Sequence, residues 1–181
     1  MSTEEIEHLR YPIGRFKRPE TITGEILAGH IRTIAQFPAK IEAAVRSLTD
    51  AQLDTPYRPQ GWTVRQVVHH CADSHLNSYI RFKLALTEDA PTIKPYFEDR
   101  WAELHDARRM PVKPSIDLLE GLHARWTETL THLSEEELDR TFIHPESGRA
   151  MSLRITVCLY AWHCAHHLAH IVELKRREGW G

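Results

Sequence analysis

The sequence has few cysteines, no long apolar run and no excess of basic residues. Its three cysteines, Cys71, Cys158 and Cys164, form no even framework, so we expect reduced thiols in a cytoplasmic protein. No stretch approaches the roughly 18 apolar residues that a membrane span needs, and the acidic start MSTEEIEHLR predicts no signal peptide. The formal net charge of −2 provides no basic surface for nucleic acid. These absences argue against a disulfide scaffold, a membrane protein and a nucleic-acid binder.

The remaining pattern is helical periodicity divided by turn signals. Pro38 marks a kink or break in the first helix, Thr63 and Gln66 form a capping box at the start of the second, and Ser115 caps the third. The connection after the second helix holds four prolines and at most a short helix near 98–105. The segment RTFIHPESGRAMSL predicts a short hairpin or an extended loop. The expected long helices cover about 23–48, 63–86, 115–133 and 152–177.

A similarity between two segments of the sequence suggests how these helices are organised. Residues 39–57 align without gaps on residues 124–142, and each copy leads from the end of one helix toward a helix rich in histidine. A single alignment of this length is compatible with chance or with a true structural repeat. As a repeat, it predicts two helical hairpins, about 20–90 and 110–181. We therefore expect an all-α protein with one helical-bundle domain over 1–181, in which facing helices supply metal ligands.

Histidine is the residue the chain has in abundance, with 13 copies and seven of them at 69–75 and 163–170. On a helical wheel, His163 and His167 lie in the middle of the apolar stripe, His170 at its margin and His166 toward solvent. The spacing i, i+4 places two imidazoles on adjacent turns, where both reach one ion. His166 and His170 have the same spacing on a wetter face and stay open as a rival pair. The alternatives to a metal are hydrogen-bonded core histidines or a polar helix face.

The first cluster offers a ligand from a second helix. His69 and His70 lie on different but equally plausible faces, so spacing does not choose between them. Asp73 either accepts the free ring N–H of a ligand histidine or is a plain surface carboxylate. Cys71 and Cys164 each point about 100° away from the neighbouring histidine on their helices, which favours nitrogen ligands without thiolate.

Two familiar metal motifs are absent. Cys164 stands where the zincin pattern needs a glutamate, and no inward carboxylate completes a two-histidine, one-carboxylate triad. Three histidines with an open fourth position are the arrangement that hydrolytic zinc uses to activate water.

The stretches GWTVRQVVHHCADSH, NSYIRFKLALTE and YAWHCAHHLAHIVELKRREGW, with the leader YPIG, closely resemble the YfiT branch of the DinB-like superfamily, over about 11–180. The resemblance implies an up-and-down four-helix bundle, one zinc or nickel ion per subunit and a homodimer. It implies His70, His163 and His167 as ligands, with Cys71 where leucine is usual. His170 stands where other members often have glutamine, which suggests a pocket residue.

This resemblance implies a metal-dependent hydrolase in which metal-activated water attacks an unidentified small molecule. The superfamily also suggests a metal-dependent transferase that moves a thiol onto an electrophile. A non-catalytic metal-binding bundle with a role in stress response is the alternative outside enzymes. No residue is identified as the general base.

Overall fold

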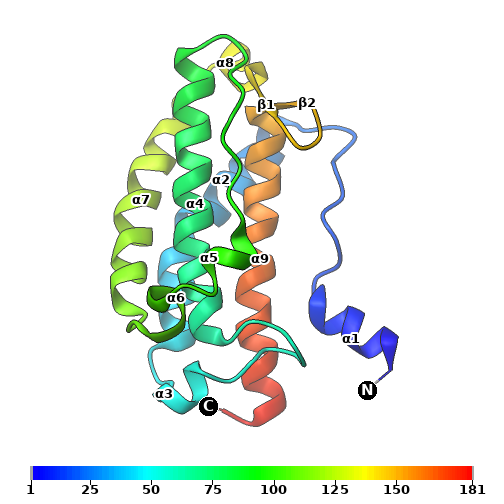
Figure 1. The fold of residues 1–181 in the computed structure, drawn as a ribbon. Helices are drawn as coiled ribbons and strands as arrows, with labels where there is room; N and C mark the ends of the chain where they lie inside the picture. The colour runs from blue at the N-terminus through cyan, green and yellow to red at the C-terminus, as the bar shows by residue number, and fades with distance from the viewer. Residues whose placement is uncertain (1, 181) are drawn as a thin grey trace.

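A computed structural model describes residues 2–180 and has four long helices: α2 (Gly24–Val45), α4 (Val64–Thr87), α7 (Lys113–Thr131) and α9 (Leu153–Glu178) (Figure 1). The short elements are α1 (Thr3–Arg10), α3 (Asp50–Leu53), α5 (Glu98–Trp101), α6 (His105–Arg109), α8 (Glu135–Asp139), β1 (Thr141–His144) and β2 (Arg149–Ser152). The strands pair as an antiparallel hairpin directly before α9. The prediction of an all-α bundle with a hairpin segment before the last helix is confirmed.

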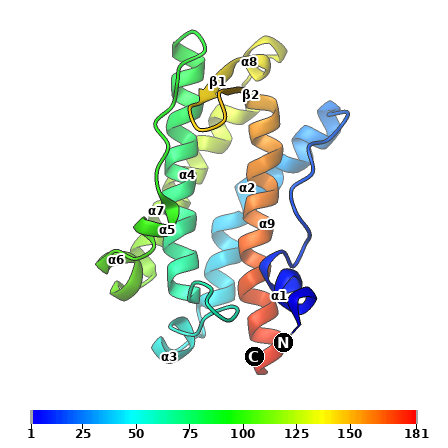
Figure 2. The same cartoon turned by 45° about the vertical axis from the view of Figure 1, so that its right-hand side comes forward.

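The order of the helices around the bundle differs from a simple up-and-down succession. Helix α2 packs against α7 and α9, and α4 packs against the same two helices, so α2 and α4 lie diagonally opposite (Figures 1 and 2). Direction alternates from α2 to α4 and from α7 to α9, whereas α4 and α7 run parallel. The reason is the long connection 88–112, which returns along the bundle and contains α5 and α6. The two predicted hairpins are therefore antiparallel pairs whose helices are separated by helices of the other pair.

The helix starts test the sequence rules individually. Thr63 accepts from the backbone N–H of Gln66, and the Gln66 side chain accepts from the N–H of Thr63, as predicted. The predicted cap at Ser115 is wrong: α7 begins at Lys113, because Pro114 has the backbone angle that suits a first helical turn. Pro38 lies inside a continuous α2 and breaks nothing. Helix α1 was not expected, although Ser2 and Glu5 form a capping box there.

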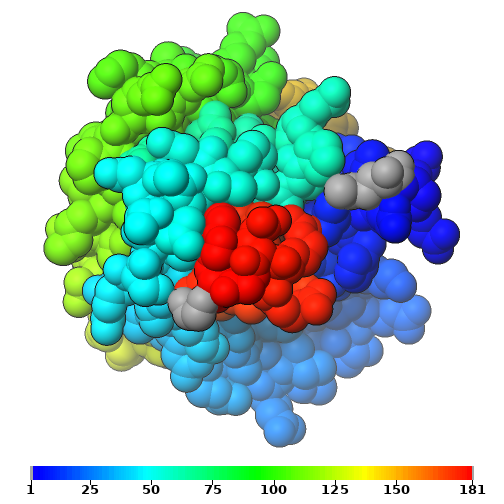
Figure 3. Space-filling model, turned by 90° about the horizontal axis from the view of Figure 1, so that it is seen from below, coloured from blue at the N-terminus to red at the C-terminus, as the bar shows by residue number. Residues whose placement is uncertain are grey.

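A hydrophobic core joins the four long helices, and its most deeply buried large side chains include Phe37, Phe82 and Trp126. Viewed along the bundle, the last turn of α9 lies between the α3 region and the N-terminal segment (Figure 3). Arg177 ties this end to the α3–α4 loop by donating to the carbonyl oxygen of Tyr57 at 2.7 Å. None of the helices in residues 2–180 is both long and apolar enough to cross a membrane. A single domain over 1–181 stays a prediction, and its first and last residues lie outside the described part.

Candidate metal centre

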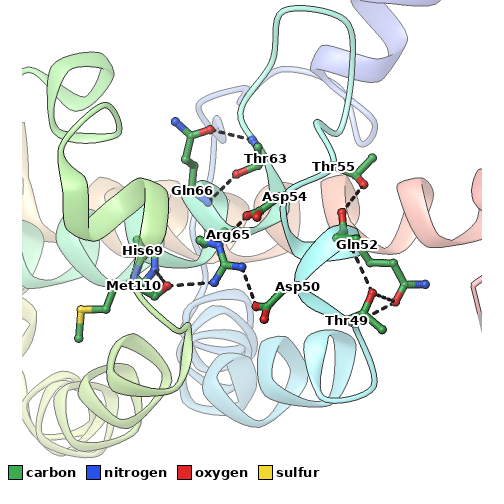
Figure 4. Close-up of polar contacts among 11 residues, drawn as sticks. Thr49, Asp50, Gln52, Asp54, Thr55, Thr63, Arg65, Gln66, His69 and Met110 are labelled. Atoms are coloured by element: carbon green, nitrogen blue, oxygen red, sulfur yellow. Dashed lines mark hydrogen bonds and ion pairs between the residues drawn. The ribbon is translucent and has the colours of Figure 1, made fainter.

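Helix α4 places its two neighbouring histidines in different environments. His70 faces α9, where its Nε2 lies 3.4 Å from Nε2 of His163. His69 faces α7, where its Nδ1 lies 2.7 Å from Oγ of Ser115. Its Nε2 lies 3.1 Å from the carbonyl oxygen of Met110, just before α7 (Figure 4). The choice between the two faces, which spacing left open, is thus made by packing: His70 turns toward the second cluster and His69 away from it.

Helix α9 brings His163 and His167 to the same place. Their ring centroids lie 4.4 Å apart, and that of His70 lies 5.4 Å from His163 and 4.8 Å from His167. One ring nitrogen of each residue can be chosen so that all three atoms lie within 4.8 Å of one another. The structure thus brings together the three residues predicted as ligands, while their metal binding itself stays a prediction.

The spacing and protonation of these nitrogens suit a metal ion. Two ligands of a tetrahedral zinc ion at 2.0–2.1 Å are about 3.3 Å apart, close to the 3.4 Å between the Nε2 atoms of His70 and His163. Burial lowers the pKa of His70 to about 3 and lowers the pKa values of His163 and His167 well below the usual range. All three imidazoles are therefore neutral at pH 7, and only neutral imidazole binds a metal.

The rival pair lies in a different environment from the one predicted. His166 is buried, because Trp162 stacks on its ring at 4.4 Å and Tyr11 from the N-terminal segment stacks at 5.7 Å. His170 stacks on Tyr57 at 3.9 Å, and its Nε2 lies 3.1 Å from the carbonyl oxygen of Arg10. The expectation that His166 faces solvent is wrong, because a segment distant in sequence covers this face of α9.

The ring nitrogens of His166, His167 and His170 also lie within 4.8 Å of one another. This second group shares His167 with the first and comes from one helix, whereas the first group joins two helices.

The remaining candidates lie outside the centre. Within the described residues, no hydrogen bond joins Asp73 to His70, and burial raises the pKa of the half-buried Asp73 to about 6. Cys71 and Cys164 are buried in the core, and burial raises the pKa of both thiols. A protonated thiol is a poor metal ligand, so the expectation of a nitrogen-only set is consistent with the structure.

Two histidines that sequence reasoning did not select lie directly behind the centre. Nδ1 of His163 is 3.0 Å from Nε2 of His75, and Nδ1 of His75 is 2.7 Å from Nε2 of His123. Both are fully buried, and burial lowers both pKa values, that of His123 to about 4. A signal was available, because His123 follows Leu119 by four residues on the apolar stripe of its helix.

The three histidines open onto a pocket of about 630 Å³. Besides histidines, aromatic and charged side chains line the pocket in equal number. The aromatic residues are Tyr11, Tyr57, Trp62, Tyr96, Tyr160 and Trp162; the charged ones are Arg10, Arg58, Arg81, Glu98, Asp99 and Glu146. Such a lining suits a small polar molecule with a flat or apolar part.

The chain is similar to known proteins over nearly its whole length. The sequence model of the DinB superfamily matches residues 33–171. YfiT of Bacillus subtilis strain 168 is 51% identical over 173 residues, which cover 96% of this chain and 97% of the relative. A protein of Bacillus cereus strain ATCC 10987, named "Putative metal-dependent hydrolase", is 54% identical over 95% of this chain and 98% of its own length.

Solved structures extend the comparison. The structure of YfiT from Bacillus subtilis, described as a probable metal-dependent hydrolase with an unusual four-helix bundle topology, matches with a TM-score of 0.94 at 50% identity. It covers 96% of this chain and 99% of that one. A mycothiol-dependent maleylpyruvate isomerase matches with a TM-score of 0.59 at 16% identity, over 82% of this chain and 60% of that one. The second likeness concerns the fold alone.

Proposed function

The chain belongs to the DinB superfamily, and from that premise we propose that it is a metal-dependent hydrolase of a small molecule. The observation that carries the proposal is the convergence of His70, His163 and His167, all neutral and from two helices, on the wall of a pocket. Relatives that share about half of its residues carry hydrolase names.

The donor set supports a borderline divalent ion. Three imidazole nitrogens without thiolate suit zinc first and nickel second. Held by these histidines, such an ion would supply a water molecule activated near neutral pH, since a bound divalent metal lowers the pKa of water to about 7. We propose one ion per subunit, held by the three histidines.

The surrounding side chains would bind the substrate and limit access of bulk water. Trp62 contacts the ring of His70 at 4.6 Å and lies 6.5 Å from the ring of His167, so it covers one side of the centre. Arg10, Arg58 and Arg81 line the same pocket and would attract a carboxylate or a polarised carbonyl group. We expect a substrate that combines a flat apolar part with a negatively polarised group.

The test compares the full chain loaded with zinc or nickel against the same chain after chelation. A panel of esters, amides and thiol–electrophile pairs is offered to both, with His163→Ala as the variant without the site. Metal-dependent cleavage of an ester or amide supports the proposal. Metal-dependent transfer of a thiol would replace it with a transferase, and tight metal binding without any turnover would identify a non-catalytic metal-binding bundle.

We also propose a cytoplasmic homodimer. The three cysteines are free and buried, as expected for a reducing compartment. The dimer rests on the resemblance to the YfiT branch, and light scattering of the full chain at several concentrations tests it. We propose no nucleic-acid or membrane partner.

A further inference from the structure

A proline in the middle of α2 leaves a backbone carbonyl without its usual partner. In an α-helix the carbonyl of residue 34 accepts from the N–H of residue 38, and residue 38 is a proline, which has no N–H. Nδ1 of His123 lies 2.7 Å from the carbonyl oxygen of Ile34 and takes that place. Pro38 therefore creates, inside the core, an acceptor that a side chain of α7 uses.

This acceptor determines the direction of the three hydrogen bonds that follow. A carbonyl oxygen only accepts, so Nδ1 of His123 carries a hydrogen, and the neutral ring leaves Nε2 as an acceptor. Nδ1 of His75, 2.7 Å away, must then donate to it, which leaves Nε2 of His75 as an acceptor. Nδ1 of His163, 3.0 Å from that atom, must donate in turn. The lone pair of His163 is thereby on Nε2, the atom that faces His70.

We propose that His75 and His123 are positioning residues that hold His163 in the tautomer able to bind the metal. The inference rests on the ligand set of the proposed function. A ligand histidine commonly donates its other ring N–H to a neighbour, which fixes its orientation and raises its basicity. Here that neighbour is a second histidine, whose own orientation depends on a third histidine and on the carbonyl of Ile34.

Aromatic side chains hold the rings of His75 and His123 in place. The ring centroid of Phe37 lies 5.2 Å from that of His75 and 5.7 Å from that of His123. The ring centroid of Trp126 lies 6.0 Å and 5.7 Å from the same two centroids. His75 and His123 are 0% and 1% exposed. The series of hydrogen bonds from His163 through His75 and His123 ends on the carbonyl oxygen of Ile34, which cannot take up a proton. The series therefore orients His163 and does not carry protons to solvent.

His167 is held differently from His163. Nδ1 of His167 is buried, and no partner for it is found among residues 2–180. The hydrogen bond to His75 thus distinguishes His163 from His167, four residues further along α9. Substitutions of His75 or His123 should therefore disturb the orientation of His163 but not that of His167.

The first test needs no substitution. In the metal-free wild-type chain at pH 7.5, ¹⁵N shifts of the histidine rings report which nitrogen carries the hydrogen. We expect His163, His75 and His123 all to be protonated at Nδ1. A His163 ring protonated at Nε2 would overturn the proposal, independently of any catalytic activity.

The second test measures zinc affinity by competition with a coloured chelator. His123→Phe keeps a ring in the core but removes both hydrogen bonds, and we expect zinc to bind about 10- to 100-fold more weakly. His123→Gln has an amide that can donate to Ile34 and accept from His75, so it should recover most of the affinity. His69→Phe removes a buried histidine of α4 that is bonded to Ser115 and Met110, and it should leave zinc affinity unchanged.

Pro38→Ala separates positioning from general stability. It restores an N–H at residue 38 that competes with His123 for the carbonyl of Ile34, while it improves α2 itself. We expect the urea midpoint of unfolding to rise and zinc affinity to fall several-fold. Wild-type affinity in both His123→Phe and Pro38→Ala would overturn the proposal. A wild-type protein that binds no zinc would contradict the ligand set instead. The tautomer measurement would still decide whether His123 and His75 orient the ring of His163.

Discussion

The two halves of the chain have the same local structure just before their histidine-bearing helices α4 and α9. In the first half, Thr49 and Gln52 form a capping box at α3, and Arg65 pairs with Asp50 and Asp54 (Figure 4). In the second half, a capping box of Ser134 and Glu137 starts α8, and Arg154 pairs with Glu135 and Asp139. Thr49 and Ser134 are 85 residues apart, and so are the corresponding acidic residues of the two halves. This is the offset of the internal sequence similarity.

The two arginine clusters differ in burial, and this difference shows what the crossover connection adds. The Arg65 side chain is 5% exposed and also donates to the carbonyl oxygen of Met110, the residue that follows α6. The Arg154 side chain is 18% exposed, and the carboxylate partners are largely exposed in both clusters. The connection 88–112 therefore covers the Arg65 side chain in the first half, whereas the Arg154 side chain in the second half is partly exposed.

The largest expected effect concerns pH, because buried histidines lie in both halves and more of them in the second. Burial lowers the pKa values of His70 and His170 to about 3 and those of His123 and His166 to about 4. The folded chain then binds fewer protons than the unfolded chain, so stability is present above pH 6.5 and is lost as pH falls toward 4. Each of these histidines should lower the free energy of unfolding by about 1–2 kcal/mol between pH 7.5 and pH 5.

Urea unfolding of the chelated protein at pH 7.5 and pH 5.0 measures this loss. His166→Phe combined with His170→Phe should flatten the pH dependence, while the exposed His132→Phe should not. Asp73 opposes the trend, because a raised pKa contributes stability at low pH, but it is one group. Equal stability at both pH values would contradict the neutral, buried state of these histidines.

The next effect compares the ligands contributed by each half. Replacing His70 or His163 with alanine should weaken zinc binding by about 100- to 1,000-fold, because a total of about 10–16 kcal/mol is shared among three or four ligands. His69→Ala and His166→Ala are the matched controls on the same two helices and should retain zinc. Full metal occupancy in His163→Ala, measured by elemental analysis, would refute the ligand set.

A smaller effect separates the two arginine clusters. Arg65→Met should cost about 2–3 kcal/mol, because it removes a guanidinium that is only 5% exposed and that also donates to the carbonyl oxygen of Met110. Arg154→Met should cost at most about 1 kcal/mol, as expected for a pair close to the surface. Urea unfolding of both variants at pH 7.5 gives the comparison, and equal losses would show that the crossover connection does not strengthen the first cluster.

The smallest effect should be the same in both halves. Thr49→Ala and Ser134→Ala each remove a side-chain acceptor at the start of a short helix, and each should cost about 1 kcal/mol. Thermal unfolding of the two variants checks this equality. A loss confined to one half would mean that the corresponding caps do not have the same role.

Local signals predicted the long helices well and their arrangement less well. The spacing of apolar residues and the Thr63–Gln66 capping box placed α4 within one residue at each end. Ser115 was a misleading signal, because Pro114 allows α7 to begin earlier and leaves the serine hydroxyl to bond His69. Two hairpins of adjacent helices were the simplest expectation, but nothing in helical periodicity reports that a connection runs back along the bundle and makes α4 and α7 parallel.

The sequence alone places His163 and His167 on one side of a helix, since their spacing of four residues on an apolar stripe brings both rings to the same face, but the same spacing left His166 and His170 open as a rival pair. Tertiary structure decided what depends on neighbouring elements. It turned His70 rather than His69 toward α9, and it buried His166 beneath Tyr11. It also linked His163 to a carbonyl in α2 through residues from α4 and α7. Those contacts join segments up to about 90 positions apart in the chain, and hydrogen bonds over such separations exist only once the helices have packed.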